Sequence, residues 1–273
     1  MQKHWFSLAV VAQLFLIGPN VAQVVQPFVF GEVHHIRSKT LGVDRVLNVY
    51  FPDGYSPDSA RTYPVIYVLD GSSNEDFPHI AGLAQFMNMY DLLPKSIVVG
   101  IANGDRRHDF TAPTKNDSDK VWVPESGGSA AFITFISDEL IPFVTAHFKV
   151  NGHRTIIGQS LGGLLCMQML FERPDLFDDH VIVSPSLWWD DGSLAAKAEA
   201  WAQRNGALNE RVFIAMGNND DIMGKQVDAV VKAFEAHTKN PFLWHYEFFP
   251  EETHATILHR AVYRGFDWLR TGK

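Results

Sequence analysis

The chain has 273 residues, of which 46% are apolar and 20% are charged, a balance typical of folded globular proteins that excludes long disordered or fibrous segments. Its net charge of −8, without a cluster of Lys and Arg, excludes nucleic acid as a partner. The single cysteine, Cys166, excludes an internal disulfide, and its place in an apolar helical pattern predicts a buried small side chain.

The first residues follow the order of a secretory signal peptide. Lys3 precedes an apolar run over residues 5–17, which is shorter than the roughly 20 residues of a membrane-spanning helix. We predict that residues 1–22 are removed during export, leaving a single domain over 23–273 in the periplasm or the medium, without stable membrane insertion. Asn20, two places before the predicted end of the signal segment at Ala22, is larger than the small residue usual there. An uncleaved anchor or a plain N-terminal helix is therefore the alternative.

Eight runs rich in Val, Ile and aromatic residues predict β-strands. The first two partly alternate polar and apolar residues, as half-buried antiparallel strands do. The other six are short runs rich in Val, Ile and aromatic residues, which suit strands covered on both faces. The runs span residues 29–38, 45–51, 64–69, 96–101, 155–157, 181–183, 212–216 and 244–249.

Six segments with helical periodicity lie between these runs and after them. They span residues 80–90, 129–147, 161–171, 193–204, 225–237 and 255–269. Because parallel strands need crossover connections, this alternation predicts an α/β fold. We expect a mostly parallel central sheet of about eight strands, with helices on both faces and the first hairpin antiparallel at one edge.

One interval, Asn103–Gly128, shows no convincing periodicity. Long irregular connections in compact domains are usually functional loops. Since ligands of open α/β sheets bind beyond the carboxyl ends of the strands, we expect this interval to border the site.

The sharpest motif is Gly158-Gln159-Ser160-Leu161-Gly162-Gly163, placed between a predicted strand and a predicted helix. It matches the G-x-S-x-G nucleophile elbow, a strained turn that projects a serine hydroxyl. The neighbouring glycines leave room where the strand and the helix nearly touch. Ser160 is therefore the predicted nucleophile, and a glycine-rich structural turn is the alternative.

A serine nucleophile needs a histidine base and an acid that orients it. His254 follows the last predicted strand, which is where proteins with this nucleophile elbow carry their catalytic histidine. His259, by contrast, lies inside the final predicted helix. For the acid, we predict Asp220, which follows the preceding strand in a Gly-Asn-Asn-Asp-Asp turn. Asp221 is the close alternative and Glu251 a distant one.

Acyl transfer also requires N–H donors for the developing oxyanion. We predict the N–H groups of Leu161, directly after the nucleophile, and of Ser72, in the turn after the third strand. A metal centre is not predicted, since the adjacent His34 and His35 point to opposite faces of a strand. Trp188, next to Trp189 after a strand end, is predicted either to line the substrate site or to pack in the core.

Several of these segments together resemble the putative-esterase branch of the α/β-hydrolase superfamily, which includes siderophore esterases, feruloyl-type esterases and S-formylglutathione hydrolase. The segments are Leu69-Asp70-Gly71, the stretch from Val99 to Asn103 with Arg106 and Asp109, the elbow, Ser184-Pro185-Ser186-Leu187-Trp188-Trp189, and Phe249 to Ile257.

The resemblance implies an α/β-hydrolase fold, Ser160 as nucleophile and His254 as base. It fixes the acid less well, because some relatives manage with a Ser–His dyad. It also implies that Arg106 and Arg107 contact anionic or catecholate groups of a substrate, with solvated loop charges as the alternative. No dedicated cap domain is evident, since only Leu187–Gly206 is available for one.

The predicted function is hydrolysis of small-molecule carboxylic esters through an acyl-enzyme, without a cofactor, with siderophores among the candidate substrates. An acyltransferase or thioesterase using the same serine is one alternative. A non-catalytic binding protein with the same fold is another. Oligomeric state is not readable from the sequence.

Overall fold

The computed structural model of the protein describes residues 25–218 and 221–272. Contacts divide the chain into residues 1–30 and residues 31–273. In the first unit, residues 25–30 have no regular secondary structure, and the predicted signal segment lies outside the described residues. Export, cleavage and the extent of the mature domain therefore stay predictions.

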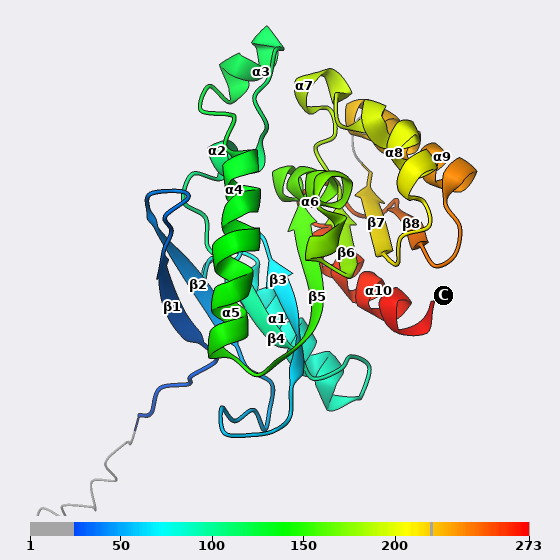
Figure 1. Ribbon diagram of the computed structural model, residues 1–273. Helices are drawn as coiled ribbons and strands as arrows, with labels where there is room; N and C mark the ends of the chain where they lie inside the picture. The colour runs from blue at the N-terminus through cyan, green and yellow to red at the C-terminus, as the bar shows by residue number, and fades with distance from the viewer. Residues whose placement is uncertain (1–24, 219–220, 273) are drawn as a thin grey trace, which may run out of the picture. The chain divides into compact units, whose positions relative to one another are not determined.

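The second unit is built on one sheet whose eight strands run in the order β1-β2-β4-β3-β5-β6-β7-β8 (Figure 1). β1 pairs antiparallel with β2, β2 pairs antiparallel with β4, and all later pairs are parallel. The predicted sheet and its antiparallel edge hairpin are confirmed. The strands are β1 (Glu32–Arg37), β2 (Asp44–Tyr50), β3 (Tyr63–Val68), β4 (Ile97–Ile101), β5 (Val150–Gln159), β6 (Asp179–Val183), β7 (Arg211–Gly217) and β8 (Leu243–Phe249).

Helices cover both faces of this sheet (Figure 1). α1 and α10 contact β4, β6 and β7 on one face, while α5 and α6 contact β5 and β6 on the other. The helices are α1 (Phe77–Met89), α2 (Arg106–Phe110), α3 (Asp117–Trp122), α4 (Ser129–Phe135), the π-helix η1 (Ile136–Leu140), α5 (Ile141–His147), α6 (Leu161–Glu172), η2 (Pro174–Leu176), α7 (Trp189–Gly192), η3 (Ala195–Lys197), α8 (Ala198–Asn205), α9 (Asp221–His237) and α10 (Leu258–Thr271).

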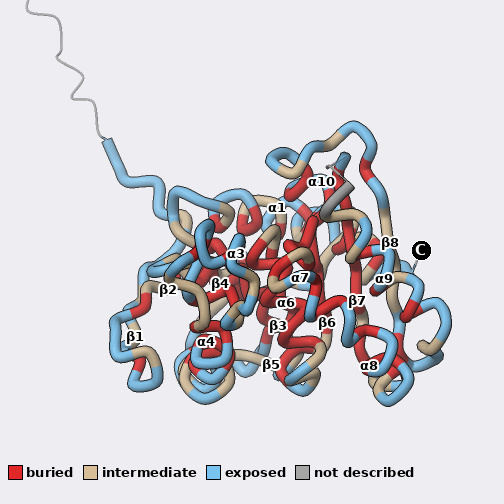
Figure 2. The backbone as a smooth tube through the Cα atoms, turned by 90° about the horizontal axis from the view of Figure 1, so that it is seen from above, coloured by how far each residue is buried: buried red, intermediate tan, exposed pale blue. Residues whose placement is uncertain are grey.

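The core is centred on α6, which follows the predicted nucleophile. Every residue from Leu161 to Leu170 is buried, including Cys166, as expected for a helix that is apolar all round (Figure 2). The continuous stretch of α4, η1 and α5 has the length and hydropathy of a membrane-spanning helix, but its residues Phe132, Phe135 and Leu140 lie in this core.

The structure differs from the sequence prediction in the interval Asn103–Gly128, which contains the short helices α2 and α3. Each begins with a side-chain cap: Asp105 accepts a hydrogen bond from the N–H of His108, and Asn116 accepts from the N–H groups of Ser118 and Asp119. Helices of five or six residues are too short to show a periodic pattern, so their capping residues are the signal for them in the sequence.

Candidate active site

Ser160 occupies the tight turn between β5 and α6. Its φ of 60° and ψ of −121° place a non-glycine residue in a sparsely populated backbone region. Backbone hydrogen bonds hold the turn: the Ser160 N–H donates to the Val183 carbonyl at 3.0 Å, and the Ser160 carbonyl accepts from the N–H groups of Leu164 at 2.9 Å and Ser186 at 3.0 Å. The strained conformation that the G-x-S-x-G motif predicts is therefore present.

The glycines around Ser160 are required by close packing. A Cβ at Gly158 would lie 2.5 Å from the carbonyl oxygen of Gly162, closer than real side chains approach. The strand and the helix can therefore meet at this turn only if residue 158 has no side chain.

His254 lies in the loop between β8 and α10, and this loop is fastened to the carboxyl ends of two strands. The side-chain amide of Gln159, at the end of β5, donates to the carbonyl of His254. The N–H of Asn218, just after β7, donates to the carbonyl of Glu252 at 2.6 Å. The structure thus brings the His254 segment beside the residue that precedes Ser160.

The competing histidine has a different environment. His259 lies in the first turn of α10, and its ring centroid is 4.4 Å from that of His79 in α1. Its ring contact is therefore with the α1 face of the sheet and not with the nucleophile turn. The choice of His254 as base stays a prediction that this placement favours.

The predicted acid follows β7. Asp220 lies outside the described residues, so its role stays a prediction. Asp221 is the first residue of α9, and Glu251 is an exposed residue of the His254 loop.

The predicted oxyanion donors belong to two turns at the same end of the sheet. Leu161 is the first residue of α6. Ser72 follows a turn in which Asp70 has a φ of 54° and the Gly71 N–H donates to the Ile101 carbonyl at 2.9 Å. The Ser72 hydroxyl accepts a hydrogen bond from the Asn103 N–H at 3.2 Å, which fixes this turn to the loop after β4. The use of both N–H groups as oxyanion donors stays a prediction.

Arg106 joins the turn after β3 to the nucleophile turn. Its Nε and Nη2 donate to the two carboxylate oxygens of Asp70 at 2.5 and 2.8 Å, and Nη2 also lies 3.4 Å from the Gln159 carbonyl. Such a bidentate pair is geometrically specific. Sequence reasoning missed the pairing with Asp70, because no local pattern links residues 36 positions apart.

The pairing limits what the guanidinium of Arg106 offers a substrate. Two of its three nitrogens are engaged, and its side chain is 31% exposed, so part of it reaches solvent at the rim. Arg107 is directed elsewhere: its Nη1 donates to the Trp122 carbonyl at 3.3 Å and lies 3.9 Å from Glu125. Contact of either arginine with substrate stays a prediction.

The two tryptophans have different environments. Trp189 is buried and donates its indole N–H to the Ala112 carbonyl at 3.0 Å, so it packs in the core. Trp188 is only partly buried, and its ring lies edge-to-face on Trp189 with the centroids 6.0 Å apart. Of the two, Trp188 is therefore the one with surface left to meet a ligand.

The interval 103–128 borders this region, as the sequence predicts. The carboxylate of Asp190, in α7, accepts from the Lys115 N–H at 2.8 Å, and its own N–H donates to the carboxylate of Asp119 in α3 at 2.7 Å. Figure 1 shows α3 and α7 beyond the carboxyl ends of the strands. A buried ion pair between Arg45 and Asp109, 2.7 Å apart, fastens the base of the interval to β2.

One carboxyl group near the predicted oxyanion turn has an unusual acidity. Burial raises the pKa of Asp76 to about 6; the charges of Asp70 and Glu75 add to this rise, and Arg106 opposes it. Asp76 precedes α1 and caps it with no side-chain hydrogen bond. Its charge is therefore poorly compensated.

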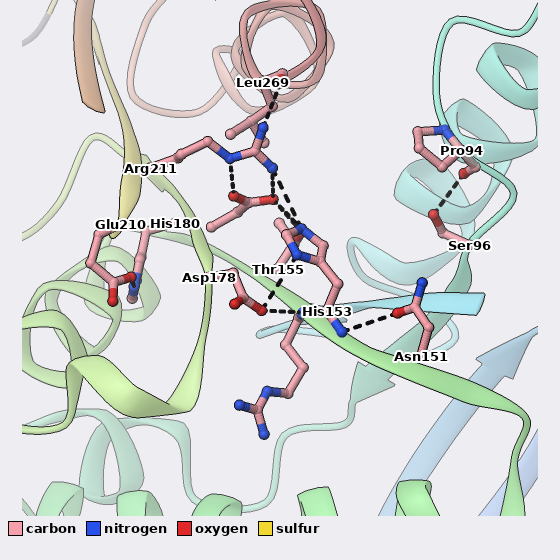
Figure 3. A network of polar contacts seen from close by, with 12 residues as sticks. Pro94, Ser96, Asn151, His153, Thr155, Asp178, His180, Glu210, Arg211 and Leu269 are labelled. Atoms are coloured by element: carbon pink, nitrogen blue, oxygen red, sulfur yellow. Dashed lines mark hydrogen bonds and ion pairs between the residues drawn. The ribbon is translucent and has the colours of Figure 1, made fainter. Parts of the chain in front are cut away.

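A second polar cluster lies at the amino ends of the strands, and Figure 3 shows it. Asp179 is 2% exposed and accepts hydrogen bonds from Arg211 at 2.6 and 2.7 Å and from Thr155 at 3.2 Å. The ring of His153 lies 2.7 Å from the same carboxylate. Burial alone would raise the pKa of Asp179, but the hydrogen bonds from His153 and Arg211 outweigh it and hold this pKa below its usual value.

The family model described as "Putative esterase" matches residues 38–263. The chain belongs to this family. It is 26% identical over 193 residues to ferri-bacillibactin esterase BesA of Bacillus subtilis, a match that covers 63% of this chain and 65% of BesA. The chain thus spans just under two thirds of that relative's length.

Two solved structures are also similar to this chain. An IroE-like serine hydrolase from Shewanella oneidensis has a TM-score of 0.81 and 27% identity, covering 88% of this chain and 80% of that chain. The BES protein from Bacillus cereus has a TM-score of 0.78 and 25% identity, covering 91% and 98%. The predicted family and α/β-hydrolase fold are confirmed, and the prediction of an ester hydrolase agrees with both.

Proposed function

We propose that this protein is a serine hydrolase of small-molecule carboxylic esters. The observation that carries the proposal is the strained backbone of Ser160, with φ 60° and ψ −121°, at the junction of β5 and α6 in a member of the putative-esterase family. Such strain persists only where the surrounding structure holds it, and it clusters at active sites.

In the proposed mechanism, His254 removes the proton of Ser160 as the hydroxyl oxygen attacks the ester carbonyl. Asp220 orients the imidazole. The N–H groups of Leu161 and Ser72 stabilise the oxyanion, and the imidazolium then protonates the leaving alcohol. Water, activated by the same imidazole, hydrolyses the acyl-enzyme.

For the substrate, we propose an ester of the siderophore class. The Bacillus subtilis relative is named a ferri-bacillibactin esterase, which motivates this choice. The partly exposed guanidinium of Arg106 and the partly buried ring of Trp188 supply a cation and an aromatic surface at the rim, a pair that suits catecholate groups. Arg107 is the less favoured contact, because Trp122 and Glu125 engage it.

The catalytic proposal is tested by a fluorophosphonate probe, which modifies activated serines. Purified protein should be labelled on the peptide that contains Ser160, and Ser160→Ala should not be labelled. Absence of labelling, under conditions that label a control esterase, would identify a binding protein that has kept the fold.

The substrate proposal is tested with short-chain acyl, feruloyl and tri-catecholate esters, using Ser160→Ala as the blank. We expect the highest kcat/KM for the tri-catecholate ester, and a preference for short acyl chains would remove the siderophore proposal. Added alcohols report on acyl transfer, since a transferase would form the new ester faster than it releases the acid.

We also propose that the protein is exported, to the periplasm or the medium. The motivation is the apolar segment after Lys3, followed by a cleavage position after Ala22. N-terminal sequencing of protein recovered from those compartments should begin at Gln23. Recovery of an intact chain beginning at Met1, in the membrane or the cytoplasm, contradicts this.

A further inference from the structure

The loop that follows β6 folds back onto the nucleophile turn. Ser184 begins the loop with a φ of 38°, and its N–H donates to the Ala215 carbonyl at 2.8 Å. Two residues later, the Ser186 N–H donates to the carbonyl of Ser160 itself at 3.0 Å. The backbone thus fixes residue 186 against the proposed nucleophile.

Gly163 makes this approach possible. A Cβ at Gly163 would lie 3.0 Å from the Cα of Pro185 and 3.0 Å from the Val183 carbonyl oxygen, tighter than nine in ten real Cβ contacts. Gly158, by contrast, serves the contact between strand and helix. The last glycine of the motif therefore has its own purpose, which is to admit the loop that carries Ser186.

The side chain of Ser186 continues this contact. Its Oγ lies 3.3 Å from the Oγ of Ser160, and the residue is 3% exposed. In the part of the chain that the structure describes, the Ser186 hydroxyl has its hydrogen bond with the Ser160 hydroxyl. A buried hydroxyl is costly unless it is hydrogen-bonded, so this contact satisfies the Ser186 hydroxyl, and either of the two oxygens could be the donor before the reaction begins.

The direction of the hydrogen bond follows from the reaction. A serine hydroxyl has one proton and two lone pairs. During attack, the Ser160 proton goes to His254 and one lone pair forms the bond to the carbonyl carbon. Only the second lone pair remains to meet Ser186, so Ser186 is the donor. A separation of 3.3 Å is long for two hydroxyls, and it shortens as Ser160 gains negative charge.

We propose that Ser186 is a positioning residue, whose hydroxyl donates a hydrogen bond to Ser160 Oγ and holds this oxygen toward His254 through the attack. The inference rests on the proposed function, because it assumes that Ser160 is the nucleophile. It adds a donor that stabilises the reacting oxygen itself, beside the predicted donors that stabilise the substrate oxyanion.

The test compares Ser186→Ala with Ser186→Thr, which keeps the hydroxyl. The control is Ser129→Ala, which removes another buried serine hydroxyl in α4. The measurements are the rate constant for labelling of Ser160 by a fluorophosphonate, kcat and KM for a 4-nitrophenyl ester, and Tm. Loss of one charge-assisted hydrogen bond is worth about tenfold in rate.

We expect Ser186→Ala to lower the labelling rate and kcat about tenfold, with KM within about twofold of wild type. Ser186→Thr should recover most of the rate, and Ser129→Ala should match wild type. The inference is overturned if Ser186→Ala reacts within twofold of wild type, if it changes KM alone, or if Ser186→Thr is no faster than Ser186→Ala. If the wild-type protein itself is not labelled, the proposed function fails, which is a distinct result.

Discussion

At the amino ends of the strands, Asp179 receives hydrogen bonds from Arg211, His153 and Thr155, and Arg211 also donates to the Leu269 carbonyl of α10 at 2.7 Å. At the carboxyl ends, Ser160, Asp70 and Ser184 all have positive φ. Both ends carry Ser, Thr, His and Asp, the residue types of hydrolytic sites. At the amino ends the Asp179 carboxylate is filled with hydrogen bonds, whereas at the carboxyl ends three strained backbone positions gather around the nucleophile turn.

This difference separates structural from catalytic candidates better than residue type does. His153 and Asp179 form a His–carboxylate pair at 2.7 Å, as a catalytic dyad would, but Arg211 already neutralises the carboxylate. The pair also lies at the end of a parallel sheet where ligands seldom bind. A carboxylate whose hydrogen bonds are filled indicates a role in stability, whereas a strained turn that its surroundings hold in place indicates a site.

The largest effect that tests this comparison is on activity. His254→Gln should lower kcat by about 10⁴-fold or more, because it removes the proposed general base. His153→Gln, the matched change at the other end, should leave kcat/KM within about threefold of wild type. Ester hydrolysis by the two purified variants is the measurement, and comparable losses in both would break the comparison.

The next effect is on stability. Arg211→Met should lower the free energy of unfolding by about 3 kcal/mol, because Asp179 would keep its charge in a buried place with fewer partners. Arg173→Met is the control, since the pair of Arg173 with Asp175 is exposed and should be worth less than about 1 kcal/mol. The measurement is the free energy of unfolding of both variants by urea denaturation. Equal, small losses in the two variants would contradict a structural role for the cluster around Asp179.

A smaller effect of opposite sign is expected for Asp76, whose pKa is raised from 3.8 to about 6. A raised carboxyl pKa means that stability falls as pH rises from the unfolded value to the folded value. Asp76→Asn should therefore stabilise the protein by about 1 kcal/mol at pH 8, allowing for partial exposure, and not at pH 4.

Chemical denaturation of Asp76→Asn at the two pH values is the measurement. Asp58→Asn, at an exposed loop position, is the control and should change nothing at either pH. A gain that is equal at pH 4 and pH 8 would mean that the charge of Asp76 is not its cause.

The smallest effect concerns His153, whose pKa is raised by its hydrogen bond with Asp179. A raised histidine pKa contributes stability that is fully present below the unfolded value of 6.5 and is lost as pH rises through the folded value. His153→Gln should therefore cost less than about 1 kcal/mol, and more at pH 6 than at pH 9. A Tm difference from wild type that is constant between pH 6 and pH 9 would contradict a raised pKa of His153.

Much of the fold was predictable because the buried strands carry continuous apolar runs. The exception within the sheet is β5, predicted over 155–157 but found over Val150–Gln159. Its first residues include Asn151, Gly152 and His153, which are polar or lack a side chain and give no apolar signal. The pairs on either side of them, Val150 with Tyr63 and Arg154 with Val65, hold them in the strand across a shift of register, and His153 contacts Asp179.

The candidate site was predictable where one short segment carries its signal, as the turn at Ser160 does. Contacts between residues far apart in the sequence were not predictable. No sequence pattern near Asp70 indicates its pairing with Arg106, and Ser186 lies in a segment noted only for its resemblance to a family. Such pairs are set by the close approach of loops, which glycines such as Gly163 permit and which no periodicity reveals.

The sole cysteine also has a practical consequence. Cys166 is completely buried beneath Gly158, and burial raises the pKa of its thiol. Thiol-reactive dyes should therefore not label the native protein, since they need an accessible thiolate. A cysteine introduced at Val121 in α3, a position 81% exposed, would take up a single fluorophore. Spectroscopy could then follow α3 during turnover without first removing a natural thiol.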